Sequence, residues 1–216
     1  MQFKKYIYCF WIFAYVSNLL GQSDYVRFIN PGFEGDPKLG CGRDFYLKGW
    51  SDCSDYYNLN ESPPDIHPGE FWEVDKSPAE GKTYIGMVTR DNGTYEIIST
   101  KLKSKLLAGF EYEFSVHLTM SDRYISRTRM TNLKANYYNP VVLVVFGSSS
   151  KCKKGEYLFE TEPIENKEWR KYFIRFKSKD DCKYLTFAAF YKKGTHMPYN
   201  GHLLIDGLSN IVKIND

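Results

Sequence analysis

The side chains that could perform chemistry lie mainly between the apolar runs of this sequence. Asp65 and His67 stand two residues apart within residues 63–69, a segment with three prolines. The prolines favour a rigid, extended loop. An aspartate and a histidine at this spacing could serve as an acid/base pair or as metal ligands, but no serine or cysteine nucleophile motif accompanies them. We therefore interpret the pair as structural.

Aromatic and polar side chains in the loops suggest ligand binding instead. An aromatic ring can stack on the C–H groups of a pyranose while nearby polar groups bond its hydroxyls. Two long connections, residues 35–80 and 121–139, carry several such rings, and loops of this length are often functional. The alternative is that these rings only pack against the sheets. The predicted ligand-binding residues are Trp72, Phe71, Tyr124, Arg90, Asn92 and Tyr191.

The charge of the chain gives no indication of a nucleic-acid partner. The formal net charge is +3, and removal of residues 1–21 leaves about +1. Arg123, Arg127, Arg129 and Lys134 form a basic cluster that could meet an anionic polymer of the cell envelope. With a nearly neutral chain, the simpler interpretation is a solvated loop face.

The N-terminus is typical of an export signal. Lys4 and Lys5 precede an apolar run over residues 6–20, and Gly21 suits the position before a cleavage point. The run is shorter than the roughly 20 residues that a membrane-spanning helix needs, although an uncleaved anchor stays an alternative. We predict a signal peptide over residues 1–21 and a single domain over residues 22–216. The mature chain is then secreted, at the cell surface or periplasmic, with no transmembrane span.

Four cysteines follow the signal peptide: Cys41, Cys53, Cys152 and Cys182. An even number in an exported chain indicates two disulfides. Three pairings are allowed, and we favour Cys41–Cys53 with Cys152–Cys182 because each pair falls within one region of the chain. A zinc site is the alternative, but no CxxC spacing exists and the four histidines are scattered.

The mature chain is a series of short strand patterns separated by turn residues. Residues 111–120 alternate cleanly between apolar and polar side chains, and residues 140–146 are continuously apolar, as in a strand covered on both faces. Asp91-Asn92-Gly93 is a hairpin signal between residues 83–88 and 95–99. Further strands are expected at 25–29, 169–177, 184–191 and 202–205. Many short strands without a helical period predict an all-β sandwich or jelly roll.

Four segments resemble the galactose-binding-like jelly rolls typified by carbohydrate-binding modules. They are Asn30-Pro31-Gly32-Phe33-Glu34, Gly49-Trp50, Ala79-Glu80-Gly81-Lys82-Thr83-Tyr84-Ile85-Gly86 and Leu203-Leu204-Ile205-Asp206-Gly207. Other segments are similar to the N-terminal jelly roll of secreted Bacteroidetes surface proteins, namely Pro63-Pro64-Asp65-Ile66, Arg90-Asp91-Asn92-Gly93-Thr94, Ser121-Asp122-Arg123-Tyr124 and Trp169-Arg170-Lys171-Tyr172. The similarity spans nearly the whole mature chain. Gly207 departs from the pattern, in which an asparagine is usual.

The resemblance also implies a structural calcium ion. In the carbohydrate-binding modules the first-strand glutamate and the last-strand aspartate share this ion, which would make Glu34 and Asp206 carboxylate ligands here. Main-chain carbonyls around Lys82 would complete the shell, since calcium takes six to eight oxygen ligands. The alternative is that Glu34 and Asp206 only cap turns or pair with Lys82.

Together these observations predict a secreted, non-catalytic binding module. The resemblance implies a carbohydrate or a cell-envelope glycan as its ligand. One alternative is a cell-surface module for protein–protein interaction or adhesion. Another is a polysaccharide-degrading enzyme, since the separation of two catalytic carboxylates cannot be read from a sequence.

Overall fold

Fifteen strands and one short 3₁₀ helix make up the described part of the protein. The computed structural model describes residues 25–40, 45–54 and 61–214, so the predicted signal peptide and Cys41 lie outside the described residues. The elements are β1 (Tyr25–Val26), β2 (Trp50–Asp52), β3 (Asp65–His67), η1 (Phe71–Glu73), β4 (Tyr84–Thr89), β5 (Ile97–Leu106), β6 (Glu111–Thr119), β7 (Ile125–Arg127), β8 (Lys134–Asn136), β9 (Asn139–Pro140), β10 (Val142–Ser148), β11 (Glu156–Glu160), β12 (Arg170–Lys177), β13 (Cys182–Phe190), β14 (Gly201–Asp206) and β15 (Ile211–Ile214).

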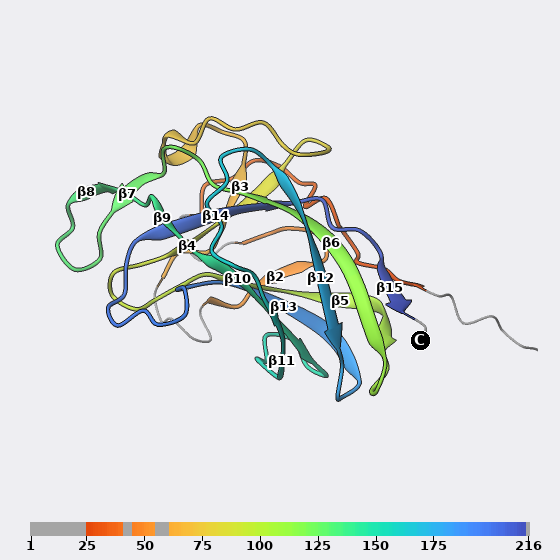
Figure 1. Ribbon diagram of the computed structural model, residues 1–216. Coiled ribbons are helices and arrows are strands. Elements are labelled where there is room, and N and C mark those ends of the chain that lie inside the picture. Colours follow the sequence, from red (N-terminus) through yellow and green to blue (C-terminus); the bar gives the residue numbers. More distant parts are fainter. Residues whose placement is uncertain (1–24, 41–44, 55–60, 215–216) are drawn as a thin grey trace, which may run out of the picture.

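Two curled sheets pack face to face (Figure 1). The larger sheet runs β1-β15-β6-β14-β4-β3, with β12 also paired to β6 and β9 to β14. The smaller sheet runs β11-β10-β13-β5-β2. All pairings are antiparallel except that of β9 with β14. The hairpin β7–β8 projects from one end of the sandwich as a separate two-stranded ribbon (Figure 1). The expected β-sandwich jelly roll is confirmed.

The alternation read from residues 111–120 is the core pattern of β6. Tyr112, Phe114, Val116, Leu118 and Met120 are all buried in the main core between the sheets. In a two-layer sandwich, each strand buries every second side chain against the opposing sheet. A clean period of two therefore identified both the strand and its inner face.

The apolar run in β10 is buried on both faces, as its sequence predicts. Leu143 and Val145 belong to the main core, whereas Val142 and Val144 belong to a second cluster on the outer face of the smaller sheet. The loop carrying Cys152 covers that outer face, so the strand has no polar side to present.

The Asp91-Asn92-Gly93 turn links two different sheets. Its backbone bonds run from Arg90 N–H to the Thr94 carbonyl and from Gly93 N–H to the Arg90 carbonyl. Only one bridge, between Thr89 and Tyr95, joins the flanking segments. Beyond it β4 continues in the larger sheet and β5 in the smaller one.

The predicted disulfide pairing is wrong. Cys53 bonds to Cys152, across a sequence separation of 99 residues, and Cys182 is a buried free thiol. Cys53 and Cys152 share the cluster on the outer face of the smaller sheet, whereas Cys182 points into the main core. The sheet itself thus separates Cys182 from Cys152, a separation that proximity along the chain did not reveal.

Within the described residues no helix is long and apolar enough to cross a membrane.

Candidate functional site

A cavity of about 810 Å³ lies on the outer face of the larger sheet, beside its β3–β4 edge. In β4, Met87 faces the main core and Val88 faces a separate outer cluster with Tyr84, Tyr124 and Tyr137. The segment around η1 and the chain from residue 121 to 137 pack over this outer face. The cavity lies between them and the sheet, and its lining residues are Gly40, Glu61, Ser62, Asp65, Trp72, Val88, Arg90, Glu96, Tyr124, Ile125, Ser126, Arg127, Arg129, Lys134 and Tyr137.

Asp65 joins two aromatic walls of the cavity. Its Oδ2 accepts hydrogen bonds from Trp72 Nε1–H, at 2.8 Å, and from the hydroxyl of Tyr124. Its Oδ1 accepts the N–H of Gly40 at 2.6 Å. Burial raises the pKa of Asp65, and these three donors oppose the rise. The carboxyl group is therefore committed to holding the two rings, which makes Asp65 a positioning residue.

The backbone around Trp72 is strained. Glu70, Trp72 and Glu73 have φ values of 57°, 57° and 61°, in the left-handed region that favours glycine. Each such residue costs roughly 1–2 kcal/mol. The bond to Asp65 and the ion pairs of Glu73 with Arg123 and Lys134 hold the segment in this form. The result is a fixed indole on the cavity wall.

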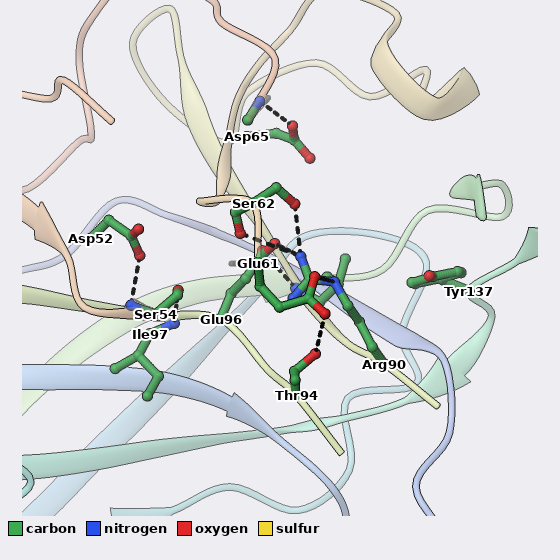
Figure 2. Close-up of polar contacts among 12 residues, drawn as sticks. Asp52, Ser54, Glu61, Ser62, Asp65, Arg90, Thr94, Glu96, Ile97 and Tyr137 are labelled. Atoms are coloured by element: carbon green, nitrogen blue, oxygen red, sulfur yellow. Dashed lines mark hydrogen bonds and ion pairs between the residues drawn. The ribbon is translucent and has the colours of Figure 1, made fainter. Parts of the chain in front are cut away.

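Arg90 lines the cavity and lies among acidic and hydroxyl side chains, Glu61, Glu96 and Ser62 (Figure 2). Its side chain is 2% exposed and forms ion pairs with Glu96 through Nη2 and with Glu61 through Nε. Nη2 also donates to the hydroxyl of Ser62 at 3.0 Å. Burial alone would lower the pKa of Arg90, but Glu96 and Glu61 raise it, so the guanidinium stays charged. Burial raises the pKa of Glu96 against the pull of Arg90.

The six predicted ligand-binding residues fall into three groups. Trp72, Tyr124 and Arg90 line the cavity. Asn92 and Tyr191 stabilise the neighbouring turn: Asn92 donates to Glu61, and the Tyr191 hydroxyl donates to the carbonyls of Arg90 and Thr94.

Phe71 is the remaining predicted residue, and it packs on the His67 ring with 5.9 Å between centroids rather than lining the cavity. Sequence reasoning left Glu61, Ser62 and Tyr137 out of the site. Their only signal was a place in, or next to, the two long connections.

Glu34 and Asp206 approach one loop from two sides. Glu34 accepts the N–H of Lys82 at 3.0 and 3.2 Å through its two oxygens. Asp206 Oδ2 accepts the N–H groups of Ala79 and Glu80, and Oδ1 accepts that of Gly207. Backbone donors therefore meet both carboxylates, which is the turn-capping arrangement. Within the described residues, no group of three or more acidic, histidine or cysteine side chains could hold a metal. The calcium ion stays a prediction.

A second, smaller cavity of about 200 Å³ lies on the smaller sheet. Tyr95, Phe146, Tyr157 and Phe190 line it, with Lys154 over the Tyr95 ring. Few polar groups converge there, so it is the weaker candidate for a polar ligand.

Fold and cavity together define a jelly-roll β-sandwich with a ligand-sized cavity on the outer face of its larger sheet. No family model and no curated protein matches the sequence. Among solved structures, the apo form of a cyclase from Fischerella sp. is similar, with a TM-score of 0.50, 12% identity, and coverage of 88% of this chain and 96% of that chain. At this identity the similarity supports the fold alone.

Two further structures are similar with lower TM-scores. The K3 cleaved adhesin domain of Lys-gingipain from Porphyromonas gingivalis W83 has a TM-score of 0.47 at 12% identity, covering 76% of this chain and 90% of that chain. The CBM22-1 xylan-binding domain of Paenibacillus barcinonensis Xyn10C has a TM-score of 0.45 at 10% identity, covering 78% and 88%.

Proposed function

We propose that this protein is a secreted, non-catalytic binding module whose ligand is a carbohydrate or a cell-envelope glycan. The observation that carries the proposal is the cavity of about 810 Å³, in which aromatic rings and buried hydrogen-bonding groups converge. Sites for small ligands commonly occupy roughly 300–1,000 Å³ and combine apolar walls with a few well-placed polar groups. A sugar ring offers the matching surfaces, since its C–H faces stack on aromatic rings and its hydroxyls take the polar groups.

Preorganisation supports binding at this cavity. Asp65 fixes the Trp72 and Tyr124 side chains through buried hydrogen bonds, so little conformational entropy is lost when a ligand enters. The Cys53–Cys152 disulfide supports export, because such bonds persist in oxidising compartments.

The hydrogen bonds of the two buried acids, Asp65 and Glu96, support a non-catalytic role. A general acid or base must exchange a proton with the ligand. Asp65 already accepts three hydrogen bonds, and Glu96 is engaged with Arg90 and with the N–H of Val88. Neither group has an evident open position toward a substrate.

Glycan-array screening followed by isothermal titration tests the proposal. We expect glycan binding that Trp72→Ala weakens at least tenfold, because the substitution removes the aromatic wall. Phe173→Ala is the matched control, since this ring is 63% exposed on β12 and does not line the cavity. A silent array, or binding that Tyr157→Ala in the second cavity abolishes while Trp72→Ala does not, would refute the assignment.

A second candidate function is protein–protein interaction at the cell surface. The observation that favours it is a set of exposed apolar side chains at the β7–β8 hairpin. On or next to this hairpin, Met130 is 71% exposed, Leu133 66% and Tyr138 62%. Exposed apolar side chains on a projecting element are typical of contact surfaces. The test measures whether the immobilised chain specifically retains one envelope protein. If the glycan array is silent, retention that the double variant Met130→Ser/Leu133→Ser loses and Met197→Ser keeps would support this function.

A further inference from the structure

Arg90, which lines the cavity, holds a buried donor without a partner. Its Nη1 is buried and has no hydrogen-bond partner, whereas Nη2 and Nε are engaged by Glu96, Ser62 and Glu61. A buried charged donor without an acceptor is costly, and native proteins rarely leave one. Because Arg90 lines the cavity, a ligand entering there can supply the missing acceptor.

The surroundings of Nη1 select the kind of acceptor. Glu61 and Glu96 both lie against the same guanidinium, at 3.3 Å from Nε in the case of Glu61. A carboxylate from the ligand would be a third acid at a guanidinium whose charge Glu61 and Glu96 already balance. A neutral oxygen, such as a sugar hydroxyl, meets the donor without adding negative charge.

The side of the cavity formed by the β7–β8 hairpin is basic. Arg127, Arg129 and Lys134, all on or beside the β7–β8 hairpin, line it. Arg129 pairs with Glu61 and Lys134 with Glu73, while Arg127 donates through Nη1 to the carbonyl of Asn132.

Arg127 is the cation of this wall without an acidic partner. Among the described residues no acidic side chain forms an ion pair with it, and its side chain is exposed where the cavity meets solvent. Four basic and three acidic side chains line the cavity altogether, and two of the acids are deeply buried. The walls therefore carry excess positive charge, concentrated on the hairpin side.

We propose that the ligand of this cavity is an acidic glycan, one built from uronic acid residues. A hydroxyl of the sugar accepts from Arg90 Nη1, and its carboxylate pairs with Arg127 at the solvent-facing wall. Guanidinium–carboxylate pairs are charge-assisted and directional, which suits recognition of a uronate over a neutral sugar. The inference rests on the proposed function and names its ligand class.

Titration with oligouronates tests it directly. The probes are galacturonate, glucuronate and mannuronate oligomers, each compared with its methyl ester, which keeps the sugar and removes the charge. We expect at least one oligouronate to bind about tenfold more tightly than its ester, a factor that corresponds to about 1.4 kcal/mol. Raising the salt concentration should reduce this preference, because the Arg127 pair is exposed.

Variants separate the two contacts. Arg127→Gln should remove the preference for the acid over its methyl ester. Arg170→Gln, an exposed arginine on β12 outside the cavity, is the matched control. Arg90→Lys should weaken acid and ester alike, and because that variant disturbs a buried ion pair, its fold is checked by circular dichroism.

The outcomes distinguish this inference from the proposed function. Equal binding of acids and esters, or a preference that survives Arg127→Gln, would overturn the acidic-glycan assignment and leave a neutral-glycan module standing. Failure of every glycan, charged or neutral, would overturn both.

Discussion

Lowering the pH from 7 to 5 probes two buried histidines beside Tyr124. His67 stacks on the Tyr84 ring with 5.2 Å between centroids, and neither of its ring nitrogens has a partner. The His202 ring lies 4.8 Å from that of Tyr124. Its Nε2 accepts the N–H of Ser121, so its Nδ1–H donates to the carbonyl of Tyr137. Burial lowers the pKa of both histidines to about 4, against an ordinary value of 6.5.

The sign and size of the effect follow from proton linkage. Because the folded pKa lies below the unfolded one, the unfolded chain binds more protons between pH 6.5 and 4. The free energy of unfolding therefore falls as the pH is lowered through this window, by about 2 kcal/mol per histidine at pH 5. Asp206 acts in the opposite direction, since burial raises its pKa to about 7 and its protonation then favours the folded chain. The contribution of Asp206 is the same in the wild type and in a histidine variant, so it cancels when their unfolding free energies are subtracted.

Urea unfolding of the wild type and His67→Phe at pH 7 and pH 5 measures this difference. We expect the stability of His67→Phe relative to the wild type to improve by about 2 kcal/mol on going from pH 7 to pH 5, with unchanged m values. His196→Gln, at an exposed histidine, is the matched control. A relative stability that does not change with pH would refute the reasoning that His67 is buried and neutral.

Three further predictions concern the disulfide, the positioning carboxylate Asp65 and the predicted calcium ion. Cys53→Ser should lower the free energy of unfolding by about 4–5 kcal/mol, because the disulfide closes a long loop, and denaturant unfolding measures this loss. Cys182→Ser should leave the disulfide intact, which thiol titration measures. Asp65→Asn should lower the unfolding free energy by about 2–3 kcal/mol and weaken glycan binding, because the charge-assisted hydrogen bonds to Trp72 and Tyr124 are lost. An unchanged unfolding free energy and an unchanged glycan affinity would contradict this prediction. If Glu34 and Asp206 hold the predicted calcium ion, millimolar calcium raises the thermal midpoint of EDTA-treated protein, and a midpoint indifferent to calcium would refute the metal site.

Strands with strong local patterns were predictable from the sequence. The alternation in β6 and the double-sided apolar run in β10 follow from the period of a strand and from burial, both of which are properties of neighbouring residues. The turn at residues 91–93 was also visible. Its role in sending β4 and β5 into different sheets was not, because sheet membership depends on partners such as β14 and β13 that lie far along the chain.

The candidate site was predictable only in part. Trp72, Tyr124 and Arg90 were selected because they are aromatic or polar residues in or next to loops, and all three line the cavity. Asp65 was interpreted as structural, and its bonds to two walls agree with that role while placing it at the centre of the site. The bond between Tyr124 and Asp65 joins residues 59 apart, a contact that no local pattern encodes.

Composition and periodicity by themselves predicted an all-β chain with aromatic-rich loops, because strand period and turn chemistry are local. Tertiary structure alone decided which of those aromatic rings share a cavity, which carboxylates hold them, and that Cys53 pairs with Cys152 while Cys182 stays in the core. The physical reason is the same in each case. A sandwich brings together residues that are distant in the chain, and it separates neighbours whose side chains point to opposite faces of a sheet.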